Sequence, residues 1–152
     1  MFLNILVAVD GSAASQRALA EAADLTRCGN AQLTLITVAP PATQFAPLAG
    51  ITPETLQVQL DEWAARILRD ELASLPDDVS AHTAQHRGHA GEEIVAELER
   101  GGYDLLVLGS RGRGRAQANL LGSVDTHVHY HADAAILSIK GDTDVDPLST
   151  GS

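Results

Sequence analysis

The chain has 152 residues, 45% of them hydrophobic and 3% aromatic, which predicts one globular domain with an aliphatic core. Twenty acidic residues against ten basic ones give a formal net charge of -10, which argues against binding to nucleic acid or to an anionic membrane surface. The single cysteine, Cys28, excludes an internal disulfide, and no apolar stretch approaches the ~20 residues that span a bilayer, so we expect a cytoplasmic protein that is not membrane-embedded.

Apolar runs interrupted by glycine or proline divide the first half of the chain into strands and helices. A near-continuous apolar run such as 2–9 is typical of a parallel strand that is covered on both faces. The predicted elements are a strand at 2–9, a helix at 13–28, a strand at 31–39, a loop at 40–52 and a helix at 53–75. Ser12 and Thr52 are expected to cap the two helices, and Trp63 falls on the apolar stripe of the second, which predicts a core position.

The second half continues the same alternation. It predicts a weaker strand at 79–85 near the sheet edge, a helix at 92–100, a strand at 103–108, a helix from about Ser123 to His131 and a strand at 134–140. Residues 1–141 are therefore expected to form the domain, and 142–152 a disordered acidic tail. This order predicts an α/β fold, an open five-stranded parallel sheet of Rossmann-like type with helices on both faces.

The segment between the fourth predicted strand and the fourth predicted helix is rich in glycine and arginine. Its glycines are Gly109, Gly112, Gly114 and Gly122, and its arginines are Arg111, Arg113 and Arg115. Glycines leave backbone amides free to approach a ligand, and a helix N-terminus favours an anion. Positive charge in an acidic chain favours a phosphate ligand, although a solvated turn would also be rich in these residues. Neither a Walker loop nor the compact dinucleotide fingerprint is present.

The spacing Gly109-x2-Gly112-x9-Gly122-Ser123 resembles the nucleotide-binding signature of the universal stress protein family, in its ATP-binding subgroup. The opening Ile5-Leu-Val-Ala-Val-Asp10-Gly-Ser12 resembles the first strand and turn of that family, and the likeness extends over residues 2–140. The resemblance implies a cytoplasmic, ATP-binding regulatory protein. It also implies a homo-oligomer, dimer or tetramer, that acts on a client such as a transporter or an enzyme, with ATP bound alone or with Mg²⁺.

The resemblance also implies which residues form the site. Asp10 would accept hydrogen bonds from the ribose hydroxyls or face a phosphate-bound Mg²⁺, and Val38 would contact adenine through its backbone. The full set of expected cofactor-binding residues is Ala8, Val9, Asp10, Val38, Leu108, Gly109, Arg111, Gly112, Arg113, Gly122, Ser123 and Val124. Of these, Gly122, Ser123 and Val124 would close on the phosphate end.

No catalytic residues are expected, because nothing in the chain assembles a nucleophile, a base and an orienting group. Two other functions stay open: a nucleotide-free homo-oligomeric interaction module, and a slow Mg²⁺-dependent ATP hydrolase that uses Asp10. His127 and His131 are spaced to share a helix face, but no third ligand accompanies them, so no metal site is expected. The last strand lacks the Pro-Val start that family members commonly carry, although 135–139 still reads as an edge that could pair in a dimer.

Overall fold

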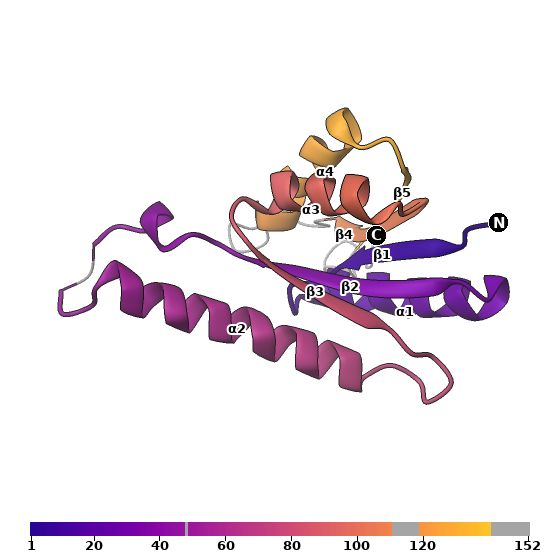
Figure 1. The fold of residues 1–152 in the computed structure, drawn as a ribbon, viewed down its shortest axis with the longest axis horizontal. Helices are drawn as coiled ribbons and strands as arrows, with labels where there is room; N and C mark the ends of the chain where they lie inside the picture. Colours follow the sequence, from indigo (N-terminus) through magenta and orange to yellow (C-terminus); the bar gives the residue numbers. More distant parts are fainter. Residues whose placement is uncertain (48, 111–118, 141–152) are drawn as a thin grey trace, which may run out of the picture.

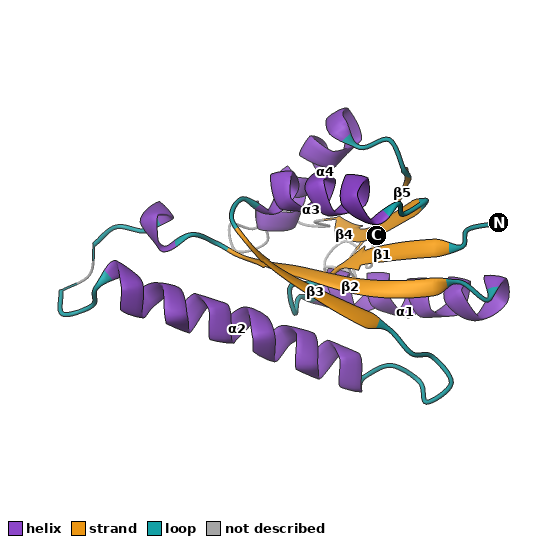
Figure 2. Ribbon diagram, viewed as in Figure 1, coloured by secondary structure: helices purple, strands orange, loops and turns teal. Residues whose placement is uncertain are grey.

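Five parallel strands form one sheet in the computed structural model, which describes residues 1–47, 49–110 and 119–140, with side chains described except at 110–123. The strands are β1 (Asn4–Ala8), β2 (Gln32–Ala39), β3 (His82–Arg87), β4 (Leu105–Ser110) and β5 (Ala135–Lys140). Their order is β3-β2-β1-β4-β5, and every neighbouring pair is parallel (Figure 2). The α/β fold with an open parallel sheet is thus confirmed.

Helices cover both faces of the sheet. They are α1 (Ala13–Gly29), α2 (Pro53–Ala73), α3 (Ala90–Gly101) and α4 (Asn119–His131), with a short 3-10 turn, η1 (Ala42–Gln44), after β2. In Figure 1, α1 and α2 lie on one side of the sheet and α3 and α4 on the other. Among the residues described, no helix has both the length and the apolar character needed to cross a membrane.

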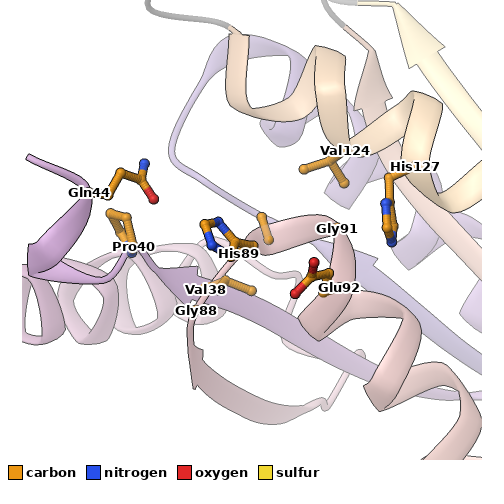
Figure 3. Close-up of a pocket in the computed structure, with 10 residues that line it drawn as sticks. Val38, Pro40, Gln44, Gly88, His89, Gly91, Glu92, Val124 and His127 are labelled. Atoms are coloured by element: carbon orange, nitrogen blue, oxygen red, sulfur yellow. The ribbon is translucent and has the colours of Figure 1, made fainter.

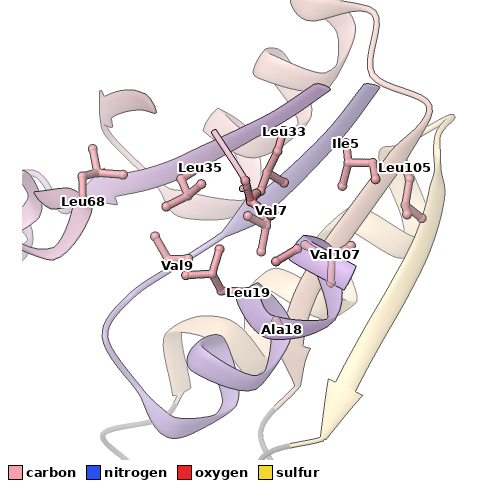
Figure 4. Close-up of a cluster of buried hydrophobic side chains, with 13 residues drawn as sticks. Ile5, Val7, Val9, Ala18, Leu19, Leu33, Leu35, Leu68, Leu105 and Val107 are labelled. Atoms are coloured by element: carbon pink, nitrogen blue, oxygen red, sulfur yellow. The ribbon is translucent and has the colours of Figure 1, made fainter. Parts of the chain in front are cut away.

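Alternate residues of the strands supply two separate cores, as expected for strands buried on both faces. On the α1/α2 side, Ile5, Val7 and Val9 pack with Leu19 and Leu35 (Figure 4). The other core lies under α3 and α4, and its buried members are Leu6, Ala8, Ile36, Ile94, Leu98, Leu106, Leu108, Val124 and Val128. Because β1 is central, its side chains from Ile5 to Ala8 contribute to both cores and are fully or almost fully buried.

The helix ends follow the predicted capping residues closely. Ser12 accepts a hydrogen bond from the backbone N–H of Ser15, and Thr52 accepts one from the N–H of Thr55. Asn30 ends α1 in the left-handed conformation, with φ of 51°. These caps are encoded in local sequence and are confirmed.

Several element boundaries differ from the sequence prediction, among them β4, which spans 105–110 rather than 103–108, and α2, which ends at Ala73 rather than at residue 75. β3 begins at His82 rather than at residue 79, because the chain pairs with β2 only from Thr34↔His82 onward, and Val79 packs into the α1/α2-side core from the preceding turn. β1 is limited to 4–8, and its expected first residues, Phe2 and Leu3, are exposed. α3 begins at Ala90, and α4 begins at Asn119, four residues before the predicted start.

The strand order creates a switch point beside β1. The chain leaves β1 for α1 on one face and leaves β4 for α4 on the opposite face, so the connections diverge at the carboxyl ends of these neighbouring strands. In open α/β sheets, ligands bind in the crevice that this divergence creates. The switch point therefore directs the search for a site to residues just after β1, β2 and β4.

Candidate functional site

Asp10 follows β1 and is held in a defined position by the start of α1. Its Oδ1 atom accepts a hydrogen bond of 2.9 Å from the backbone N–H of Ser12, and its own N–H donates to the hydroxyl of Ser15 at 3.2 Å. The turn requires a glycine at position 11, where φ is +82°. Among the described residues, no hydrogen bond is made to the second carboxylate oxygen of Asp10.

A second acid, Glu71 of α2, lies within electrostatic reach of Asp10. Its side chain is buried, with 5% exposed. Burial raises the pKa of Glu71, and the negative charges of Asp10 and Asp70 raise it further. The end of α2 therefore adds negative potential to the strand edge that carries Asp10.

We expect Glu71→Gln to stabilise the fold at pH 7 by roughly 1 kcal/mol, because it removes a buried charge that no cation contacts in the described part of the chain. With its folded pKa above the ordinary 4.5, the carboxyl holds a proton in the folded state after the unfolded state has lost it. The wild type therefore loses stability as pH rises through the folded pKa of Glu71. The stability difference between Glu71→Gln and wild type should vanish below about pH 4. Urea unfolding at the two pH values measures this, and the exposed Glu62→Gln serves as the control. An equal midpoint for Glu71→Gln and wild type at pH 7 would contradict it.

Two adjoining cavities open at the carboxyl edge of the sheet. The smaller, of about 30 Å³, is lined by Ala8, Val9, Asp10, Ile36, Thr37, Val38, Trp63, Ala90 and Ile94. The larger, of about 350 Å³, is lined by Val38, Pro40, Gln44, Gly88, His89, Ala90, Gly91, Glu92, Val124 and His127 (Figure 3). Val38 and Ala90 border both cavities, so the two lie next to each other and are considered together as the candidate site.

The outer rim of the larger cavity is fixed by a glutamine of α2. The Gln57 side-chain oxygen accepts from the backbone N–H of Ala42 at 2.7 Å, and its amide nitrogen donates to the carbonyl of Pro40 at 3.2 Å. The same amide nitrogen also donates to Asp61. The segment that carries Pro40 and Gln44 is thereby tied to α2 at the mouth of the cavity.

The structure brings five of the sequence-predicted site residues to these cavities. Ala8, Val9, Asp10 and Val38 line the smaller one, and Val38 and Val124 line the larger one. These residues come from β1, β2 and α4, which are far apart in the sequence.

The other predicted site residues either do not line these two cavities or lie outside the described residues. The Leu108 side chain is completely buried in the α3/α4-side core, so only its backbone can face a ligand. Gly109 lies against α1, where an added Cβ would come 2.5 Å from the backbone carbon of Ala14. Gly122 and Ser123 are the fourth and fifth residues of α4 rather than its start. Arg111, Gly112 and Arg113 lie outside the described residues.

Several lining residues were not predicted. Gly88 and His89, which precede α3, and the first three residues of α3 form one wall of the larger cavity. Trp63 is half-buried and borders the smaller cavity beside Asp10, rather than lying wholly within the core. The closely spaced glycines at 88 and 91 were the one available signal for a backbone that approaches a ligand or another helix.

The chain contains six histidines and twenty acidic residues, residue types that can bind a metal ion. Within the described ranges, no group of three or more His, Cys, Asp or Glu side chains is placed to hold a metal ion. The rings of His127 and His131 contact each other in a tilted arrangement, with centroids 4.3 Å apart and an interplanar angle of 37°. The pair therefore presents an aromatic surface to its surroundings.

The fold and these cavities define an α/β protein of the open parallel-sheet class with a ligand-sized site at its carboxyl edge. The model of the universal stress protein family matches residues 1–140. This chain belongs to the universal stress protein family. Universal stress protein YxiE of Bacillus subtilis is 30% identical over 151 residues, which cover 92% of this chain and all of the relative.

Solved structures share the fold over most of their length. Universal stress protein UspA from Lactobacillus plantarum is 27% identical with a TM-score of 0.72, covering 90% of this chain and 97% of that one. A family member from Arabidopsis thaliana, solved with AMP bound, is 21% identical with a TM-score of 0.58 and 99% coverage of both chains. Two further members with TM-scores of 0.56 and 0.53 were solved in complex with cAMP and, from Archaeoglobus fulgidus, with dAMP.

Proposed function

We propose that this chain binds an adenine nucleotide, ATP in particular, at the carboxyl edge beside Asp10. The observation that carries the proposal is the pair of cavities that meet at Val38 and include an Asp10 carboxylate oxygen with no partner in the described part of the chain. Family members solved with AMP, cAMP and dAMP support the ligand class. The common portion of these ligands is an adenine base on a ribose or deoxyribose, which matches one polar anchor next to a larger, mainly apolar cavity.

The strand order suggests how the nucleotide would lie. Asp10 follows the central β1, and β2 and β4 flank it. A sugar that donates its hydroxyls to Asp10 would place the base over Val38 at the end of β2. The phosphates would then extend toward Gly109 at the end of β4 and the segment that carries Arg111, Gly112, Arg113, Gly122 and Ser123.

Mg²⁺ would bind at this site together with the nucleotide rather than to the protein alone. Mg²⁺ takes about six oxygen ligands and retains several waters, and it commonly binds through one carboxylate together with substrate phosphates. Asp10 can supply that carboxylate. In the wider proposal, the protein acts in the cytoplasm as a regulatory homo-oligomer, and a client such as a transporter or an enzyme responds to its nucleotide-bound state.

Titration calorimetry with ATP, ADP and AMP tests the proposal. We expect wild-type protein to bind all three, and Asp10→Asn to weaken each by about tenfold or more, because a hydrogen bond to a charged group contributes about 1.5–3 kcal/mol. Glu21→Gln makes the same charge change at an exposed position of α1 and should leave binding unchanged.

The alternative functions give different results in the same preparation. A wild-type protein that binds none of the three nucleotides at millimolar concentration would overturn the proposal and favour a nucleotide-free interaction module. Sustained release of phosphate from ATP with Mg²⁺, abolished by Asp10→Asn, would instead identify a hydrolase.

A further inference from the structure

One wall of the larger cavity is an aromatic ring held in place by an unusually close approach of two helices. His127 of α4 packs directly on Gly91 of α3. A Cβ added at Gly91 would lie 2.9 Å from both Cβ and Cγ of His127, a separation that real side chains essentially never show. The ring is therefore fixed against the α3 backbone, at a position that depends on glycine in the facing helix.

The His127 ring interacts with its surroundings as an aromatic surface rather than as a polar group. Its nitrogens make no hydrogen bond to any described residue, while the His131 ring packs against it from the next turn of α4. His131 does not line the cavity, but His127 and Val124 do. Figure 3 shows His127 at one side of the cavity, across from Pro40 and Gln44.

The charge of the cavity favours a base over a phosphate as its occupant. Glu92 lines the same cavity, so a phosphate placed beside its carboxylate would face like charge. A neutral aromatic base avoids that repulsion. Val38, Pro40 and Val124 add the apolar surface that a flat ring needs.

This inference rests on the proposed function. We propose that the cavity of about 350 Å³ holds the base of the bound nucleotide and that the His127 ring stacks on that base. His127 then contributes to affinity through its flat face, because every base offers a π-face and stacking needs no hydrogen bond from the ring nitrogens. The phosphate end of the ligand gains nothing from this residue.

The test compares AMP with inorganic tripolyphosphate on four proteins: wild type, His127→Ala, His127→Phe and the control His129→Ala, an exposed residue of the same helix. We expect His127→Ala to weaken AMP about tenfold, since base stacking on an aromatic side chain contributes about 1–3 kcal/mol. His127→Phe should stay within about threefold of wild type, because phenylalanine keeps a flat ring at the same Cβ and Cγ. Tripolyphosphate affinity should be equal in all four.

A spectroscopic readout accompanies the affinities. Addition of AMP, but not of tripolyphosphate, should move the ring proton resonances of His127 upfield, as expected for protons that lie over an aromatic base. Equal AMP affinity of wild type and His127→Ala would overturn the inference and leave the proposed function standing. A loss in His127→Phe as large as in His127→Ala would also overturn stacking, because the ring nitrogens would then carry the effect. A wild-type protein that binds no AMP would overturn both proposals.

Discussion

Gly109→Val is expected to destabilise the fold by about 3 kcal/mol or more, independently of any ligand. A Cβ at this position would lie 2.5 Å from the carbonyl carbon and 2.6 Å from the carbonyl oxygen of Ala14, both backbone atoms. Backbone of a packed helix cannot shift as a side chain can, so α1 must move away from β4 and open the α1/α2-side core. The midpoint of urea unfolding measures the loss.

Two further variants test whether the destabilisation comes from the contact with the α1 backbone or from the loss of a glycine in general. Gly29→Ala, at the end of α1, places a Cβ 3.2 Å from the Phe2 carbonyl oxygen and should have a small effect. Adding Ala14→Gly to Gly109→Val should restore little, because it removes only the Ala14 Cβ and leaves the two closer backbone atoms in place. An unfolding midpoint for Gly109→Val equal to that of wild type would show that α1 can yield at this contact.

This contact changes how the first glycine of the signature is interpreted. The sequence predicts that Gly109 approaches ribose and phosphates, whereas the structure gives it a packing requirement against Ala14. Both needs can act on one residue, because its backbone ends β4 at the ligand-facing edge while its missing side chain admits α1. Sequence alone could not distinguish them, since the contacting residue lies about ninety positions earlier.

Local signals in the sequence were sufficient for most of the fold. Uninterrupted apolar runs defined the central strands, and the capping residues Ser12, Thr52 and Asn30 fixed three helix ends. The prediction was least accurate for β3, where alternation from Val79 suggested a strand that starts too early. Val79 is buried as that pattern implied, but its burial comes from packing after a turn rather than from pairing in the sheet.

Only part of the candidate site could be predicted from the sequence, because the rest depends on how distant helices pack together. Asp10 could be placed at the ligand-facing edge because it follows the first strand, whereas Val38 was assigned from the family resemblance. The opposite wall depends on how α3 and α4 pack, which is set by the Gly91–His127 contact and by no local pattern. Trp63 borders the site because α2 crosses the sheet near Asp10, an arrangement that helical periodicity does not specify.

A buried carboxylate of α3 is joined to several neighbouring side chains by hydrogen bonds, and replacing it is expected to have a large effect on stability. Glu97 is 3% exposed, and its Oε1 lies 2.8 Å from Nε2 of His86, while the Tyr103 hydroxyl donates to Oε2 at 3.0 Å. Arg100 also donates to Oε1. The other ring nitrogen of His86 lies 3.0 Å from Glu93, so the network joins the edge strand β3 to α3 just below the turn that lines the larger cavity.

Glu97→Ala is expected to cost about 3 kcal/mol at pH 7, since it removes a buried carboxylate and leaves the Tyr103 hydroxyl and Nε2 of His86 without their partner. Its effect should be seen as a lower urea midpoint. Glu99→Ala, an exposed change on the same helix, should stay within about 0.5 kcal/mol of wild type. If the two variants were equally stable, the network would contribute nothing to the fold.

The pH dependence of Glu97→Gln tests whether the charge of this carboxyl, rather than its shape, provides the stability. Burial raises the pKa of Glu97, but hydrogen bonds from His86, Tyr103 and Arg100 lower it more, so the folded value lies below the ordinary 4.5. A group with a depressed pKa in the folded state contributes stability above its unfolded pKa and loses it as pH falls through the folded value. The stability difference between wild type and Glu97→Gln should therefore be largest above about pH 5 and shrink steadily toward pH 3. A difference that stays constant over this range would mean that the negative charge of Glu97 adds no stability through its contacts with His86, Tyr103 and Arg100.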